Sequence, residues 1–103
     1  MVESHVAWSV GHAVLTLRGE IDLSDGAAVS DLLTSICSEQ PLRLFVDLTD
    51  VTAIRNVVLG LLATVVGKLR EAGCPLVFIN PSVTTREQMH SHGLEDLLQL
   101  DPA

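Results

Sequence analysis

The sequence predicts an α/β fold, in which helices pack on a mixed β-sheet within a single domain covering residues 1–103. The length of 103 residues suits one hydrophobic core and is too short for two. Apolar residues make up 48% of the chain, which is enough to fill such a core. Two alternating segments come first, and helical patterns then take turns with short apolar runs.

The N-terminal segments are expected to form a β-hairpin. Apolar and polar residues alternate along His5–Val10 and again along Ala13–Arg18, and Gly11-His12 is the expected turn. A period of two is typical of strands with one buried face. This antiparallel pair would make the sheet mixed.

The rest of the chain predicts the order β-β-α-β-α-β-α. Each later strand is followed by a helix of crossover length, which is typical of a parallel sheet. The expected elements are a loop at 19–23, a helix at about 25–39 with Ser24 as its N-cap, a strand at Leu42–Leu48, a loop at Thr49–Arg55, a helix at about 57–72 with Asn56 as its N-cap, a strand at Pro75–Asn80, a helix at Ser82–His92 and a short helix or edge element at Leu94–Leu100.

Charge and hydropathy argue against nucleic-acid and membrane partners. Six Lys and Arg residues against thirteen Asp and Glu residues give a formal net charge of -7. Binding to phosphates or to anionic lipid needs a basic face. The longest apolar run, Val57–Val66, is much shorter than the roughly 20 residues of a spanning helix, so no direct membrane insertion is expected. Met1–His12 lacks the pattern of a signal peptide, and the sequence predicts a cytoplasmic protein.

The two cysteines, Cys37 and Cys74, fall in a helical pattern and just before an apolar strand. We expect both to be small buried hydrophobic residues, reduced in a reducing compartment. Their number and spacing do not make a zinc site.

No catalytic pattern is recognisable, so the sequence predicts neither an enzyme nor a cofactor. It contains no GxGxxG, GxxxxGK[ST], GxSxG or HExxH motif and no Tyr. His90 and His92 would point to different sides of a helix, which argues against a shared metal. We expect surface positions for all four histidines, the other two being His5 and His12.

Several segments together resemble the STAS domain, the family of anti-sigma-factor antagonists and of the cytoplasmic tails of sulfate transporters. The segments are LTLRGEIDLSDGAAVSDLL (15–33), LFVDLTDVTAI (44–54), LGLLATVVGKLREAGCPLVFINPS (59–82) and HGLEDLL (92–98). The resemblance covers nearly the whole chain. It implies a STAS-like domain that binds a protein partner.

In that family the segment after the third strand usually resembles Asp-Ser-Ser/Ala-Gly-Leu. An anti-sigma factor with kinase activity phosphorylates its first Ser, and phosphorylation ends the binding. In this sequence, Arg55 occupies the usual Asp position, Asn56 the phospho-acceptor position and Val58 the usual Gly position. Asn has no hydroxyl to phosphorylate, so the resemblance implies a module that a kinase cannot switch off at this site. The other interpretation is that Asn56 merely caps a helix.

The neighbouring residues leave further alternatives open. Arg55 faces a partner, pairs with Asp22 or Asp50, or is simply solvated. Thr49 and Thr52 carry hydroxyls and are alternative phosphorylation sites. Asp22 is expected to cap the first helix or to contact the partner. Asp47 is expected to orient the loop that follows it.

The predicted partner-binding residues come from the turn at Gly19–Ser24, the loop at 49–56 and the start of the second helix. They are Asp22, Ser24, Thr52, Arg55, Asn56, Val57 and Leu59. The second helix is apolar nearly all round, so Leu59 and Ala63 belong either to the core or to an exposed apolar patch.

The resemblance implies an anti-sigma-factor antagonist that binds a kinase-type anti-sigma factor and so releases a sigma factor. The alternative is a cytoplasmic accessory subunit of an ABC lipid transporter. A nucleotide or small-ligand sensor is a third hypothesis, which no Gly-rich phosphate loop supports. The sequence leaves the oligomeric state open.

Overall fold

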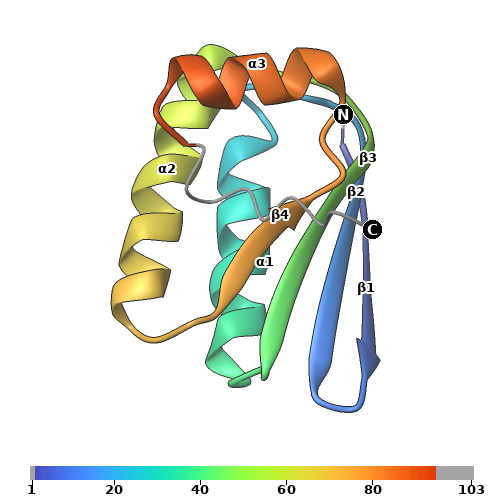
Figure 1. The fold of residues 1–103 in the computed structure, drawn as a ribbon, viewed down its shortest axis with the longest axis vertical. Helices are drawn as coiled ribbons and strands as arrows, with labels where there is room; N and C mark the ends of the chain where they lie inside the picture. The colour runs from blue at the N-terminus through green and yellow to red at the C-terminus, as the bar shows by residue number, and fades with distance from the viewer. Residues whose placement is uncertain (1, 95–103) are drawn as a thin grey trace.

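Four strands form one mixed sheet, and two long helices cover one of its faces (Figure 1). The computed structural model describes residues 2–94. Its elements are β1 (Glu3–Ser9), β2 (His12–Ile21), α1 (Gly26–Ser38), β3 (Arg43–Ile54), α2 (Asn56–Glu71), β4 (Leu76–Ile79) and α3 (Val83–Ser91). The predicted α/β class and the order of elements are confirmed. The predicted element at Leu94–Leu100 lies, beyond Leu94, outside the described residues.

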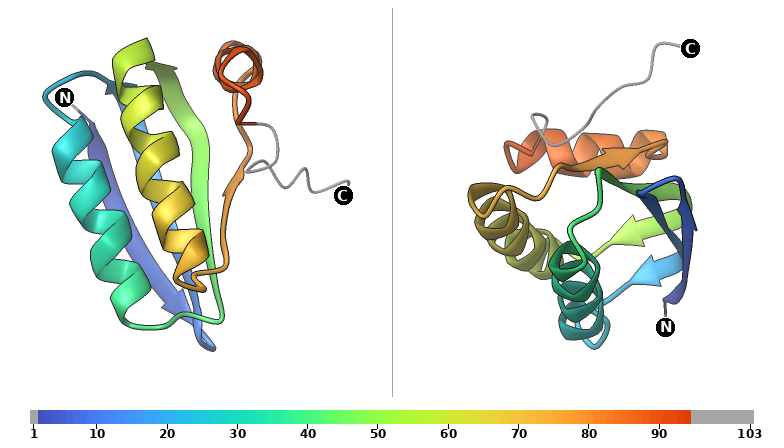
Figure 2. Two further views of the ribbon diagram at one scale, coloured as in Figure 1. Left: turned by 90° about the vertical axis from the view of Figure 1, so that its left-hand side faces the viewer. Right: turned by 90° about the horizontal axis from the view of Figure 1, so that it is seen from below.

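The strand order explains why both helices lie on the same face. The sheet runs β1-β2-β3-β4, with β1 antiparallel to β2 and the other neighbours parallel. Both crossovers therefore step across the sheet in the same direction. Since such crossovers are right-handed, α1 and α2 fall on one side. Figure 2 shows this layer, with α3 lying beside β4 rather than between the two long helices.

The predicted hairpin is confirmed, with its turn one residue earlier than expected. Val10 and Gly11 have φ values of 50° and 80°, and His12 already pairs with Ser9. Two consecutive residues in the left-handed region form the kind of turn whose twist matches that of a hairpin. The turn at Gly11-His12 was therefore misplaced by one residue.

Two predicted loops are largely strand. β2 continues to Ile21 and β3 continues to Ile54, where the ends of the two strands pair with each other. The predictions of loops at 19–23 and 49–55 were wrong because Gly19 and the polar residues of β3 are poor strand signals locally. Parallel pairing supplies the backbone hydrogen bonds, and two register shifts accommodate the irregular stretch.

The core lies between the helix layer and the sheet. The strands contribute alternate residues to it, and each long helix contributes one stripe. Its members include Leu15, Leu17, Ile21, Val29, Leu33, Leu44, Val46, Leu48, Leu59, Leu62 and Val66. Within residues 2–94, no helix is long and apolar enough to cross a bilayer.

The cysteines correct a sequence prediction. Cys37 and Cys74 are half-buried rather than buried, and they form a disulfide with each other, so they are not free thiols. The end of α1 and the connection from α2 to β4 meet at the same end of the molecule. This brings the two Cα atoms to 5.8 Å, a normal separation for a disulfide. Local sequence patterns do not predict this disulfide, because the two cysteines are 37 residues apart in the chain.

Candidate functional site

The turn before α1 and the start of α2 lie together at one end of the molecule. Both helices begin at the top of Figure 1 and run downward side by side. Between their starting points is an open hollow of about 470 Å³, lined by Asp22, Leu23, Ser24, Arg55 and Val57. These five residues, with Asn56 and Leu61, are called the entry surface below.

A network of hydrogen bonds shapes the turn at residues 22–25. Asp22 Oδ1 accepts hydrogen bonds from the amide (3.0 Å) and hydroxyl (2.6 Å) of Ser24. Asp25 is the N-cap residue of α1, with its carboxylate buried. Asp25 Oδ2 accepts from the amide of Asp22 at 3.1 Å. Ser24 was therefore wrongly predicted as the N-cap, because its side chain bonds backward to Asp22 instead of forward to the helix.

The hydroxyl of Ser24 also affects the charge of Asp22. Its hydrogen bond lowers the pKa of Asp22 from the ordinary value of 3.8, with a further lowering from Asp25. Hydrogen bonds to a carboxylate favour its ionised form. The hollow therefore keeps a negative charge at Asp22 throughout the neutral pH range.

Arg55 joins the start of α2 to the sheet. It is the N-cap residue, with extended backbone (φ -61°, ψ 140°), and its amide donates to the carbonyl of Ile21 at 3.0 Å. Its Nε lies 3.6 Å from Glu20 Oε1, and both side chains are more than half exposed. The predicted partners Asp22 and Asp50 were wrong, because Glu20 lies next to Ala53 across the parallel pair and Asp50 pairs with Arg18.

Asn56 is the first residue of α2 and is exposed. It does not cap the helix, since Arg55 occupies the N-cap position and no side-chain hydrogen bond closes that end. The predicted N-cap role of Asn56 is therefore wrong. The first amides of a helix have no partner within it, so this end presents donors beside the Asn56 side chain.

Apolar side chains on the entry surface are exposed. Leu23 and Val57 are each 69% exposed, and Leu61 is 41% exposed. Val57 and Leu61 are four residues apart, and so lie on the same side of α2. Leu59, in contrast, is fully buried in the core, and Ala63 is half-buried. The hypothesis of an exposed patch at Leu59 and Ala63 is therefore wrong, because Leu59 belongs to the core and Ala63 packs against it.

The two threonines and Asp47 lie on β3. Thr49 and Thr52 are exposed, and neither lines the hollow. Asp47 Oδ1 accepts from the amide (2.9 Å) and hydroxyl (2.6 Å) of Thr49. Asp47 lies within the strand rather than at its end. It holds Thr49, two residues further along β3, and it also accepts from Asn80 Nδ2, just after β4, at 3.5 Å.

The structure thus brings together most of the residues that the sequence singled out. Asp22, Ser24, Arg55 and Val57 line one hollow, and Asn56 lies between Arg55 and Val57 in the chain. Leu23 and Leu61 were missed. Leu23 had a signal, since it is a large apolar residue inside a predicted turn. Leu61 had none, because only the tertiary packing decides which face of an apolar helix is exposed.

Across residues 2–94, no group of three His, Cys, Asp or Glu side chains is arranged to hold a metal ion. The hollow is open, and its lining combines the acidic turn at Asp22 with the exposed apolar side chains of Leu23 and Val57.

A family model described as "Mlab, STAS domain" matches residues 4–99. The chain belongs to the STAS domain family. The resemblance seen in the sequence is thereby confirmed over nearly the whole length.

Among curated proteins, this STAS domain is similar to the anti-sigma-F factor antagonist RsfB of Mycobacterium tuberculosis. The two are 33% identical over 90 residues, which cover 87% of this chain and 73% of RsfB. The STAS domain described here is thus homologous to anti-sigma-factor antagonists.

Solved structures agree with this fold. An anti-sigma factor antagonist from Mycobacterium paratuberculosis superposes with a TM-score of 0.82 at 25% identity, covering 100% of this chain and 87% of that one. The unphosphorylated form of SpoIIAA, an anti-sigma factor antagonist, gives a TM-score of 0.79 at 15% identity, covering 96% and 88%. The second likeness concerns the fold alone.

Proposed function

We propose that this STAS domain is a non-enzymatic binding module that captures a kinase-type anti-sigma factor in the cytoplasm and so releases a sigma factor. The observation that carries the proposal is the entry surface. Charged, hydroxyl and apolar side chains line one open hollow at the start of α2, and the Asn56 amide is exposed beside it in the chain. The homology to RsfB supports the choice of an anti-sigma factor as the partner.

The apolar part of the surface provides affinity and the polar part provides orientation. Leu23, Val57 and Leu61 are exposed in the free protein, so a partner that covers them gains from their removal from water. Arg55, which pairs with Glu20, and Asp22 line the same hollow as Leu23 and Val57, and their charges set which charges a partner must present.

The binding is proposed to be insensitive to phosphorylation at position 56. Asn56 is exposed at the helix start, is uncharged and has no hydroxyl. A phosphate at this position would add about 1.5–2 negative charges to the contact surface. Without a hydroxyl at position 56, that residue stays uncharged and the surface stays in its binding-competent form.

Phosphorylation at Thr49 or Thr52 would restore a switch. Thr49 is the weaker candidate, because its hydroxyl donates to Asp47 at 2.6 Å and a phosphate there would face a carboxylate. Thr52 is exposed, so it is the better alternative acceptor.

The test is a pull-down from the native cell with the wild-type chain and two matched variants. Val57→Asp places a charge on the entry surface, and Leu42→Asp places one on a similarly exposed residue away from it, the exposed fractions being 69% and 67%. We expect wild type and Leu42→Asp to recover a kinase-type anti-sigma factor, and Val57→Asp to lose it. Equal recovery by both variants would contradict the assignment of the surface.

The same experiment addresses the alternative function as an accessory subunit of an ABC lipid transporter. An ABC ATPase in the eluate, without any anti-sigma factor, would replace the proposed function by the transporter role. The entry surface would then be the expected contact with the ATPase, and Val57→Asp would be expected to lose the ATPase while Leu42→Asp keeps it.

Phosphorylation is tested with the recovered partner and ATP. We expect the intact mass of the wild-type chain to stay unchanged and the complex to persist. A gain of about 80 Da, the mass of one phosphate group, located at Thr52 would show that the switch has moved rather than disappeared. In that case a Thr52→Val variant, incubated with the partner and ATP, would gain no phosphate and would stay bound to the partner.

A further inference from the structure

The disulfide lies at the end of the molecule opposite the entry surface. Cys37 is the last but one residue of α1, and Cys74 lies in the connection between α2 and β4. The bond therefore ties the ends of the two long helices together. At their other end the helices approach closely, since a Cβ at Gly26 would lie 3.0 Å from Leu61 Cδ2.

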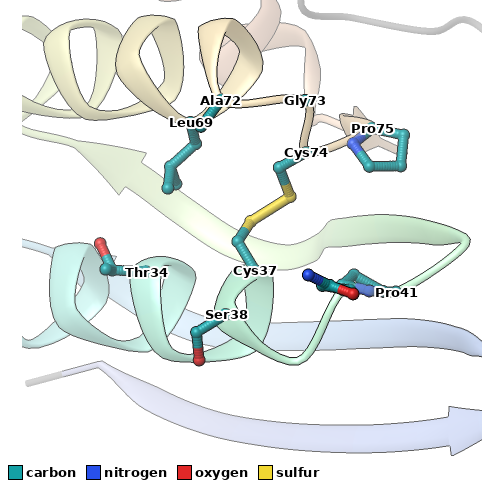
Figure 3. Close-up of a pocket in the computed structure, with 10 residues that line it drawn as sticks. Thr34, Cys37, Ser38, Pro41, Leu69, Ala72, Gly73, Cys74 and Pro75 are labelled. Atoms are coloured by element: carbon teal, nitrogen blue, oxygen red, sulfur yellow. A yellow bond between two sulfur atoms is a disulfide. The ribbon is translucent and has the colours of Figure 1, made fainter.

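An open pocket of about 470 Å³ reaches this disulfide, and both cysteines line it. Figure 3 shows the bond between Thr34 and Leu69 on one side and Pro41 and Pro75 on the other. Both cysteines are half-buried. A thiolate can reach a disulfide directly only if at least one sulfur is accessible, and the pocket gives that access.

We propose that the Cys37–Cys74 disulfide is a reversible thiol–disulfide exchange site, reduced in the folded protein by a dithiol reductant that enters this pocket. In the cytoplasm most disulfides are transient or redox-sensing. The argument from the cytoplasm rests on the location given under the proposed function. The argument from the pocket is independent of that location.

The exchange proceeds in two steps. A thiolate of the reductant attacks one cysteine sulfur, which breaks the Cys37–Cys74 bond, forms a mixed disulfide and releases the other cysteine as a thiolate. The second thiol of the reductant then attacks its own sulfur in the mixed disulfide and releases the remaining cysteine. Two electrons pass to the protein, and the reductant becomes a disulfide.

Backbone hydrogen bonds hold both cysteines after the bond opens. The Cys74 amide donates to the carbonyl of Leu69 at 2.9 Å, and the Gln40 amide donates to the carbonyl of Cys37 at 3.0 Å. These bonds do not depend on the disulfide. The two thiols therefore stay close together, so that an oxidant such as oxidised glutathione can join them again.

The test measures reduction of the native protein by dithiothreitol, with free thiols trapped by iodoacetamide and counted by intact mass. We expect no thiol before reduction, two after it and none after reoxidation. Direct attack through the pocket predicts a rate within about tenfold of that in denaturant, whereas attack through global unfolding is slower by about 10³-fold or more.

Two comparisons distinguish direct attack from attack through unfolding: Thr34→Phe with Ser35→Phe, and Val29→Ala with the wild type. Thr34→Phe fills the pocket and is expected to slow reduction about tenfold, while Ser35→Phe, on the same helix but outside the pocket, leaves the rate unchanged. Val29→Ala removes core volume far from the disulfide. If the reductant attacks directly, Val29→Ala changes the rate of reduction little. If reduction needs global unfolding, Val29→Ala raises the rate by about tenfold or more.

Several results would overturn the proposal. They are free thiols in the untreated protein, reduction only in denaturant, a rate that follows the destabilisation of Val29→Ala, and equal rates for Thr34→Phe and Ser35→Phe. Circular dichroism of each variant shows that it is folded. Because no partner protein takes part, these outcomes are independent of the anti-sigma-factor pull-down.

Discussion

Asp25 links three separate parts of the chain through one side chain. Only 7% of the residue is exposed. Its Oδ1 accepts from the amide of Val2, ahead of β1, and its Oδ2 accepts from the amide of Asp22, each at 3.1 Å. A buried carboxylate needs such donors, because removing it from water without them is costly. The entry surface therefore depends on Asp25, although Asp25 does not line the hollow.

We expect Asp25→Ala to lower the free energy of unfolding by about 1–3 kcal/mol, because two amides lose their charged acceptor. Urea denaturation monitored by circular dichroism measures the change. Asp31→Ala, an exposed position on the same helix, is the matched control and is expected to change stability by less than about 0.5 kcal/mol. Equal effects of the two variants would show that the Asp25 bonds contribute nothing specific.

The pH dependence at the residue scale concerns Asp22. Because the pKa of Asp22 is lower in the folded state, its ionised carboxylate stabilises the fold at pH values above the ordinary pKa of 3.8. This stabilisation is lost as the pH falls through the folded-state pKa. We expect Ser24→Ala to raise the pKa of Asp22 toward 3.8, because its largest cause, the Ser24 hydroxyl, is removed. Carboxyl-carbon NMR titration measures it, and an unchanged midpoint would contradict this cause.

Among the elements, β3 is longer than its neighbour β4. The β3–β4 pairing runs only from Leu44 to Asp47, so the last residues of β3 have no strand on that side. The side chain of Gln88, on α3, takes the place of a strand at Ile54. Its Nε2 donates to the Ile54 carbonyl at 2.7 Å, and its Oε1 accepts from the Ile54 amide at 3.2 Å. Through Gln88, α3 thereby holds the backbone of Ile54, the residue just before Arg55.

We expect Gln88→Leu to destabilise the protein by about 1–3 kcal/mol, because the amide and carbonyl of Ile54 lose their partners. Hydrogen exchange at the Ile54 amide should become faster, and a urea titration gives the free energy. Glu87→Leu introduces the same side chain at the exposed neighbouring position, where we expect no such change. Slow exchange at Ile54 in the Gln88 variant would show that another group satisfies the strand end.

For the whole molecule, the disulfide is the longest-range covalent constraint in the described residues. It joins cysteines 37 residues apart and closes a loop that contains β3 and α2. Such a link restricts the unfolded chain more than the folded one. The parallel arrangement of α1 and α2 places this constraint at one end and the entry surface at the other.

We expect the double variant Cys37→Ser with Cys74→Ser to lose about 2–4 kcal/mol of stability relative to the oxidised protein. Urea denaturation with and without dithiothreitol measures this. The wild type in reductant should match the double variant, which separates the bond from the substitutions. If the oxidised wild type were no more stable than the double variant, the bond would contribute nothing to the fold.

The sequence determined the order of elements, the hairpin, the mixed sheet and the STAS family membership. These rest on patterns of short range, because alternation along His5–Val10 and the stripe of Val29, Leu33 and Ile36 follow from the geometry of single strands and helices. The resemblance to the family also predicted one contact surface from the turn at Asp22–Ser24 and the segment Arg55–Val57. In the structure Asp22, Ser24, Arg55 and Val57 line one hollow, and binding there stays a prediction.

Only the tertiary structure decided which distant residues meet. It paired Cys37 with Cys74, Arg55 with Glu20 and Gln88 with Ile54, and it placed Leu59 in the core while leaving Leu61 exposed. None of these follows from local periodicity, because each depends on the register and crossover of segments far apart in the chain. Pairing of β2 with β3 likewise turned two predicted loops into strand, since a neighbouring strand satisfies backbone groups that local composition leaves undecided.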